Sequence, residues 1–119
     1  MRITNNTITE FSALLFRKMS EKYGGETTLN ELRVMNQVWR CHLRCSKCDC
    51  GPTALSEMTG IPKSTVSRTV FNLIQAGWLV EERHPNDRRR NIVRPGPRST
   101  ARIEADWREC IEWLEELTA

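Results

Sequence analysis

The stretch TALSEMTGIPKSTVSRTVFNLIQAGWL, residues 53–79, constrains the fold of this chain more than any other segment. It contains two short helical patterns separated by a tight turn at Gly60. Thr53 is expected to cap the first helix, Pro62 to open the second and Gly77 to end it. The apolar residues expected to face inward are Leu55 and Met58 in the first helix, and Val66, Val70, Leu73 and Ile74 in the second. Two short helices joined in this way predict a helix-turn-helix.

The periodicity of the sequence changes after Gly77. Residues 78–80 and 91–94 are short runs with β propensity, and the turn dipeptide Pro85-Asn86 lies between them. They predict a β-hairpin whose return strand is stopped by Pro95 and Pro97. Basic side chains crowd the hairpin turn, at Arg83, His84, Arg88, Arg89 and Arg90. Contact with a polyanion would relieve the repulsion between adjacent arginines, and a projecting arginine can enter a DNA minor groove.

Three further segments have helical periodicity, at residues 5–22, 28–43 and 99–117. The last has an apolar face whose spacing alternates between three and four residues, as in paired helices. The residues of this face that we expect to form a homodimer seam are Trp107, Cys110, Ile111, Leu114 and Leu117. Packing of the same face on the chain's own domain is the alternative, and core packing is the expected role of Cys110.

These elements predict a mainly α fold with a small β-hairpin wing, a winged helix-turn-helix whose N- and C-terminal helices dimerise. The length of 119 residues indicates one domain over residues 1–119. We expect an N-terminal helix within 1–26, a winged-helix core over 27–94 with a cysteine-rich loop at 41–50, and a C-terminal helix within 95–119.

Composition and charge favour a cytoplasmic protein with a polyanionic partner. The chain is 28% charged and 39% hydrophobic, and it has no apolar run long enough for a membrane span and no cleavable signal pattern. The formal net charge is +3, yet residues 95–119 carry three basic against six acidic side chains. The basic body could therefore face nucleic acid while the acidic tail does not.

The second helix of the helix-turn-helix presents polar side chains opposite its apolar stripe. They are Lys63, Ser64, Thr65, Ser67, Arg68 and Asn72. A helix fits the major groove of DNA, and hydroxyl and basic groups near its N-terminus can reach base edges and phosphates. The pattern predicts double-stranded DNA as the partner, with an ordinary solvated helix face as the alternative.

Residues 27–94 resemble the winged-helix core of MarR-family transcription regulators. The likeness depends on the short helix closing at Gly60, on residues 63–68 (KSTVSR) opening the next helix, and on Asp87-Arg88-Arg89, which is similar to the Asp-x-Arg signature of that family's wing. The cysteine-rich loop looks like an insertion, and Pro95-Gly96-Pro97 departs from the family pattern after the wing.

The resemblance implies roles for individual residues. The helix carrying Lys63, Ser64, Thr65, Ser67 and Arg68 would enter the major groove, and Arg88 or Arg89 would reach the minor groove. His84 and Arg90 complete the wing surface that we expect to contact DNA, and Asp87 would hold the shape of the wing. Members of the family are dimers built from their terminal helices, so a palindromic operator is implied.

The loop CHLRCSKCDC places four cysteines within ten residues, at Cys41, Cys45, Cys48 and Cys50. The spacing of Cys45 and Cys48 suits a zinc knuckle, which Cys41 and either Cys50 or His42 could complete. Neighbouring basic residues would lower thiol pKa values, which favours oxidation as well as metal binding. A zinc site, a redox switch and inert cysteines are the open alternatives, and in a reducing compartment a disulfide knot is disfavoured.

The sequence therefore predicts a sequence-specific DNA-binding transcription regulator, with the cysteine loop as a candidate metal or redox sensor. The rival function is a winged-helix module for protein interaction or assembly that binds no specific DNA. No paired carboxylates, Gly-rich phosphate loop or His-Glu helix motif is present, so an enzyme is not expected.

Overall fold

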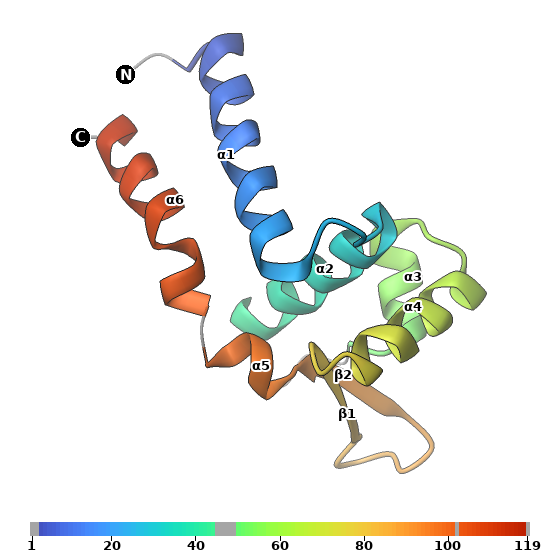
Figure 1. Cartoon of the computed structure of the whole chain (residues 1–119). Coiled ribbons are helices and arrows are strands. Elements are labelled where there is room, and N and C mark those ends of the chain that lie inside the picture. The colour runs from blue at the N-terminus through green and yellow to red at the C-terminus, as the bar shows by residue number, and fades with distance from the viewer. Residues whose placement is uncertain (1–2, 45–49, 102, 119) are drawn as a thin grey trace. The chain divides into compact units, whose positions relative to one another are not determined.

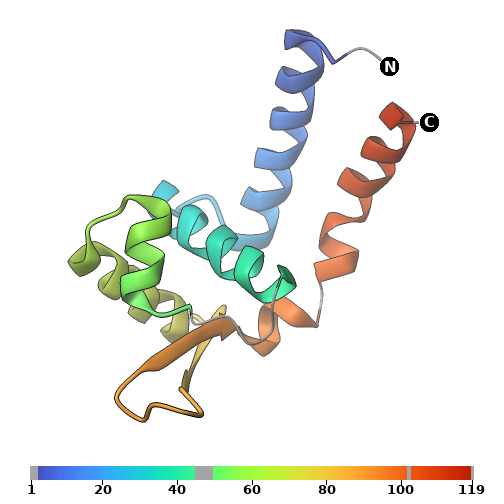
Figure 2. The ribbon, with the colours of Figure 1, turned by 180° about the vertical axis from the view of Figure 1, so that it is seen from behind.

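The computed structural model describes residues 3–44, 50–101 and 103–118. The elements, shown in Figures 1 and 2, are α1 (Asn5–Tyr23), α2 (Leu29–Arg44), α3 (Pro52–Thr59), α4 (Lys63–Gln75), β1 (Leu79–Arg83), β2 (Asn91–Pro95), α5 (Pro97–Thr100) and α6 (Ile103–Thr118). The prediction of a mainly α winged helix-turn-helix with one β-hairpin is confirmed. In the described part of the chain, no helix combines the length and the apolar character that a membrane span requires.

The chain divides into two compact units. One is residues 28–101, which form the winged helix, and the other is built from α1 and α6. A single domain over residues 1–119 remains a prediction.

The core of the winged helix lies among α2, α3, α4 and the hairpin. Its largest fully buried side chains come from every one of these elements: Val34, Val38, Leu55, Val66, Leu79 and Val93. Each such side chain stabilises the fold by about 1.5–3 kcal/mol relative to an exposed position. The apolar stripe predicted for α4 is buried at Val66, Val70 and Leu73, whereas Ile74 is half-buried.

Two expectations for α3 are wrong. Thr53 does not cap the helix, because the helix begins at Pro52 and Gly51 occupies the N-cap position. Met58 does not face inward, since 47% of it is exposed. The short helix has room for one buried anchor, Leu55, and the Met58 sulfur instead accepts a hydrogen bond from Gln37 Nε2 at 3.2 Å.

The hairpin is antiparallel and longer than predicted on its first strand. Leu79 pairs with Pro95 and Arg83 with Asn91. Pro95 therefore ends the return strand as expected, although it still lies within it. The backbone N–H of Val93 donates to the carbonyl of Cys50 at 2.8 Å, which joins the hairpin to the start of α3.

The single C-terminal helix predicted for residues 99–117 is wrong, because two helices occupy this region. Gly96 and Pro97 open the short helix α5. The Ser99 hydroxyl is fully buried and donates to the carbonyl of Trp78 at 3.0 Å, and Arg98 donates to the carbonyl of Ala76 at 3.0 Å. These bonds hold α5 on the winged helix. The longer helix, α6, begins at Ile103.

In the other unit, α1 and α6 run antiparallel. The rings of Phe11 and Trp113 stack with centroids 5.3 Å apart, and Lys18 Nζ lies 2.6 Å from a carboxylate oxygen of Glu109. No residue of α1 is buried. Among the described side chains of α6, only Cys110 is buried, so this pair of helices has almost no core of its own.

Candidate nucleic-acid interface

The solvent face of α4 carries most of the residues that the sequence predicted for DNA contact. Lys63, Ser64, Ser67 and Arg68 are exposed, whereas Thr65 is half-buried. The opposite face is buried because Val66, Thr69, Val70 and Leu73 lie in the core. The buried face therefore anchors α4 in the core, and the polar residues of its N-terminal turn are exposed to solvent.

A hollow of about 300 Å³ lies where α4 meets the start of α3 and the wing, and we call it the basic hollow. It is lined by residues 51–54, by Lys63 and Ser67, and by Glu81 with residues 89–91. Three cationic side chains, those of Lys63, Arg89 and Arg90, oppose the single carboxylate of Glu81. This arrangement favours an anionic group.

The wing tip is ordered by hydrogen bonds from its own backbone. The Nδ1 atom of His84 accepts hydrogen bonds from the N–H groups of Asn86 at 3.0 Å and Asp87 at 3.1 Å. A carboxylate oxygen of Asp87 accepts from the N–H of Arg89 at 3.1 Å. Because Nδ1 acts as the acceptor, only the Nε2 side of His84 is available to a ligand. The arginines that follow are presented from a defined turn.

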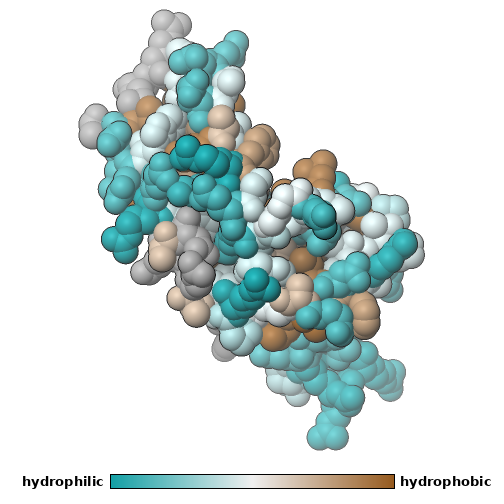
Figure 3. Space-filling model, viewed as in Figure 1, coloured by the Kyte–Doolittle hydropathy of each residue, from teal (hydrophilic) through white to brown (hydrophobic). Residues whose placement is uncertain are grey.

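Hydrophilic side chains cover the projecting wing at the bottom of the space-filling view (Figure 3). Arg88, Arg89 and Arg90 are all exposed, and Arg89 and Arg90 line the basic hollow. At the base of the hairpin, Arg94 pairs with Glu82 at 3.3 Å, which neutralises one of the two neighbouring carboxylates. The outer wing and the start of α4 therefore both place positive charge at the basic hollow.

The cysteine-loop prediction falls largely on residues that the structure does not describe. Cys45 and Cys48 lie outside the described residues. Cys41 is half-buried near the end of α2, where Gln37 Nε2 donates to its sulfur at 3.7 Å, and Cys50 is buried. Within the described ranges, no three potential metal ligands cluster. The zinc site with Cys41, Cys45, Cys48 and Cys50 stays a prediction.

The predicted dimer seam on α6 is partly exposed. Ile111 is 46% exposed and Leu114 is 43% exposed, while Trp107 and Leu117 are half-buried. Cys110 is buried, as its expected core role requires, and this burial raises the pKa of its thiol. Whether the seam pairs two chains remains a prediction.

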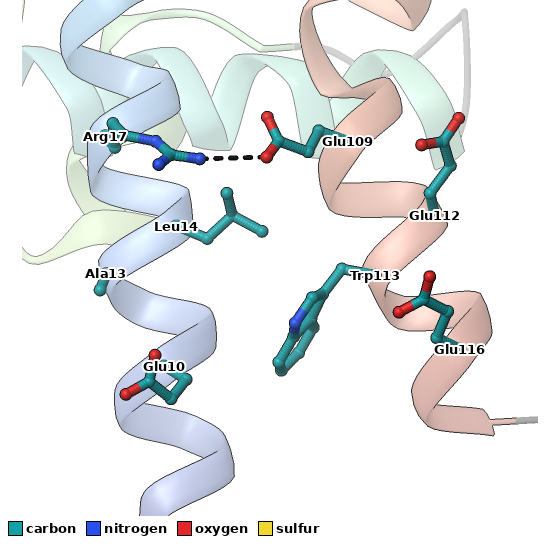
Figure 4. A pocket seen from close by; sticks show the side chains of 8 residues that line it. All are labelled: Glu10, Ala13, Leu14, Arg17, Glu109, Glu112, Trp113 and Glu116. Atoms are coloured by element: carbon teal, nitrogen blue, oxygen red, sulfur yellow. Dashed lines mark hydrogen bonds and ion pairs between the residues drawn. The ribbon is translucent and has the colours of Figure 1, made fainter.

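The face between α1 and α6 is hollowed and acidic. A cavity of about 470 Å³ is lined on the α6 side by Glu109, Glu112, Trp113 and Glu116 (Figure 4). Arg17 of α1 reaches across to Glu109 at 3.1 Å. The hydrogen bond from Lys18 is the main cause that lowers the pKa of Glu109, and the same bond raises the pKa of Lys18. These charges make this unit an unfavourable surface for a polyanion.

The fold and the basic hollow define the class of protein as a winged helix-turn-helix. Residues 49–90 match the model of the MarR family. The family resemblance drawn from the sequence is therefore confirmed for the segment that holds the helix-turn-helix and the outer wing.

Solved structures show the same fold over almost the whole chain. A crystal structure of RV1404 from Mycobacterium tuberculosis has a TM-score of 0.71 at 13% identity, covering 99% of this chain and 82% of that one. A MepR mutant from S. aureus bound to an oligodeoxyribonucleotide has a TM-score of 0.66 at 14% identity, covering 98% and 83%. Wild-type MarR from E. coli has a TM-score of 0.55 at 20% identity, covering 91% and 76%. None of the curated proteins matches this sequence.

Sequence reasoning missed two features of this interface. The first is Phe71, which is 60% exposed on α4 among polar residues. The sequence contained a signal for it, because Phe71 is an apolar residue outside the helical stripe that buries Val70 and Leu73. The second is the basic hollow itself, which combines three separate segments and has no local signal.

Proposed function

We propose that this chain is a double-stranded DNA-binding transcription regulator. The observation that carries the proposal is the basic hollow, where Lys63 of the recognition helix α4 and Arg89 and Arg90 of the wing converge. A phosphate of the DNA backbone seated there would anchor α4 in the major groove and the wing beside it. The family match over residues 49–90 and the DNA-bound MepR structure support this function.

The contacts divide into two kinds. Lys63, Arg89 and Arg90 would position the protein on phosphates, whereas Ser64, Ser67 and Arg68 lie on the exposed side of α4 and would face base edges. Arg88, at the wing tip outside the hollow, is the arginine that we assign to the minor groove. The Nε2 atom of His84 would face the sugar-phosphate backbone of the DNA.

A homodimer is part of the proposal. The helices α1 and α6 bury little of their apolar surface in one chain, and Ile8, Phe16, Ile111 and Leu114 remain exposed on them. A second copy would cover these side chains, and its two-fold axis would require two half-sites in the DNA. A cytoplasmic location, the absence of enzymatic activity and a sensor role for the cysteine loop, with zinc or by oxidation, belong to the same proposal.

The test is the salt dependence of DNA binding by the full chain, measured by fluorescence anisotropy on a short mixed-sequence duplex. Counterion release makes the logarithm of affinity fall linearly with the logarithm of salt concentration. Replacing Arg88 and Arg89 together with alanine should weaken binding and flatten the slope by about 0.9 for each phosphate that the variant no longer neutralises. Arg108→Ala, which removes an exposed positive charge from α6, is the matched control and should leave the slope unchanged.

The rival function predicts a different result. A winged helix used only for protein assembly would bind the duplex weakly, and the double alanine variant and Arg108→Ala would then behave alike. Equal slopes for the two variants would refute the wing assignment. Absence of binding at low salt would refute the DNA-binding function as a whole.

A further inference from the structure

Phe71 is a large apolar side chain that lies mostly in solvent. It is 60% exposed in the third turn of α4, while the core side of the same helix is closed by Val66, Val70 and Leu73. Burying a phenylalanine side chain would stabilise the protein, so this ring contributes little to folding where it stands.

The ring lies in the middle of the solvent face of α4. With 100° between successive residues, Phe71 lies within a few tens of degrees of Ser64 and Gln75 around the helix axis, opposite the buried stripe. Lys63, Ser67 and Phe71 are each four residues apart and form one ridge along the helix. The first two of these line the basic hollow, so Phe71 continues the ridge one turn beyond it.

The neighbours of Phe71 on this face are polar. Ser64, Ser67, Arg68, Asn72 and Gln75 are all exposed. On α4, a single exposed large apolar ring among hydrogen-bonding side chains differs from the contiguous apolar patch that protein partners bind. The major groove offers a matching target, because thymine presents a C5-methyl group there beside hydrogen-bonding base edges.

We propose that Phe71 is a specificity-determining residue that contacts the C5-methyl group of a thymine in the major groove. The inference rests on the proposed DNA-binding function and adds the chemistry of one base to it. Polar residues of α4 would read neighbouring base edges by hydrogen bonding, while Phe71 would discriminate thymine by its methyl group alone.

The test compares thymine with deoxyuridine, which lacks only that methyl group. A duplex is first selected from a random library with the full-length wild-type chain, and each thymine of the selected sequence is then replaced singly by deoxyuridine. For wild type, replacing one particular thymine of each half-site should lower the affinity about fourfold, because the contact with one methyl-sized group is lost. Phe71→Ala should bind the thymine duplex more weakly and show less than about half of that discrimination on the same logarithmic scale.

Two further variants make the result specific. Leu29→Ala removes an exposed apolar side chain of α2, 70% exposed, and should keep the wild-type response to deoxyuridine. Phe71→Leu keeps an apolar contact and should retain part of the discrimination between thymine and deoxyuridine. Circular dichroism checks that each variant is folded.

The same measurement separates a chain that does not bind DNA from a chain that binds DNA without using Phe71 to recognise thymine. If no duplex is enriched, the DNA-binding function fails and the inference fails with it. If a duplex is enriched but wild type and Phe71→Ala respond alike to every deoxyuridine replacement, DNA binding stands and the role of Phe71 is refuted.

Discussion

The imidazole of His84 accepts a hydrogen bond at Nδ1 from the backbone N–H of Asp87, at 3.1 Å. The same atom accepts a second bond from Asn86. The side chain of His84 thus accepts hydrogen bonds from the backbone of the wing. These bonds fix the turn that precedes Arg88 and Arg89. The shape of the wing tip depends on this ring.

Replacement of His84 by phenylalanine should loosen the wing tip, because the ring is retained while the acceptor is removed. Each neutral hydrogen bond contributes about 0.5–1.5 kcal/mol, so amide exchange at Asn86 and Asp87 should accelerate by about twofold to twelvefold. NMR measurement of amide exchange tests this. Arg83→Ala, an exposed neighbour on β1, is the control, and equal protection in wild type and His84→Phe would contradict the prediction.

Replacement of Gly96 by alanine should destabilise the protein. A Cβ atom at this position would lie 2.7 Å from the carbonyl oxygen of Gly77, and that backbone cannot move freely because the N–H of Gly96 donates to Trp78. Overpacking of this kind costs about 1–3 kcal/mol in the free energy of unfolding, which urea denaturation measures. Gly25→Ala is the matched control, since a Cβ there meets no atom within 4 Å, and equal losses of stability from both variants would contradict the steric argument.

Glu109→Gln should destabilise the α1–α6 pair in a pH-dependent way. Its carboxylate accepts from Lys18 and Arg17, and the hydrogen bond from Lys18 lowers its pKa. A lowered pKa means that the ionised form stabilises the folded state above the unfolded-state pKa, and this contribution is lost as pH falls through the folded-state pKa. The difference in unfolding free energy between wild type and variant should therefore be present at neutral pH, shrink below the ordinary value of 4.5 and weaken at high salt.

The control for this prediction is Glu112→Gln. Glu112 is also exposed on α6 and lines the same cavity, but the described residues give it no ion pair. Its replacement removes a carboxylate from the same cavity without breaking an ion pair of the described residues, so it should reduce stability at neutral pH less than Glu109→Gln does. A Glu109→Gln effect that is independent of pH would show that the ion pairs contribute nothing to stability.

Replacement of Ile111 and Leu114 by glutamate should convert the proposed dimer into a monomer. Both side chains are exposed in the single chain, and charge buried between two copies without a partner is strongly unfavourable. Light scattering after size exclusion measures the molar mass. Leu29→Glu places the same charge on α2 and should leave the mass unchanged; a wild-type chain that is monomeric at all concentrations would contradict the proposal.

Much of the winged helix could be predicted from the sequence because its signals are local. Helix boundaries follow from apolar spacing within one segment and from Gly60 and Gly77, both of which have positive φ angles here. The hairpin and its basic turn follow from a change of period and a turn dipeptide. The solvent exposure of Lys63, Ser64, Ser67 and Arg68 follows from their positions opposite the buried stripe.

The structure differs from the expectations drawn from the sequence where the conformation of one element depends on another. Met58 has an inward helical position in the sequence, yet α3 is too short to bury both it and Leu55. The C-terminal helix is interrupted because Arg98 and Ser99 bond to carbonyls of Ala76 and Trp78, more than twenty residues earlier. No periodicity within residues 95–119 encodes those partners.

The sequence by itself determined the helix-turn-helix, the wing and the sign of their charge, since each depends on spacing and residue type within a continuous segment. Only the tertiary structure decided that Lys63, Arg89 and Arg90, which come from α4 and the wing, line one hollow. The physical reason is that the free energy of packing among α2, α3, α4 and the hairpin sets how these segments face one another. That packing is a property of the assembled core and of no single segment.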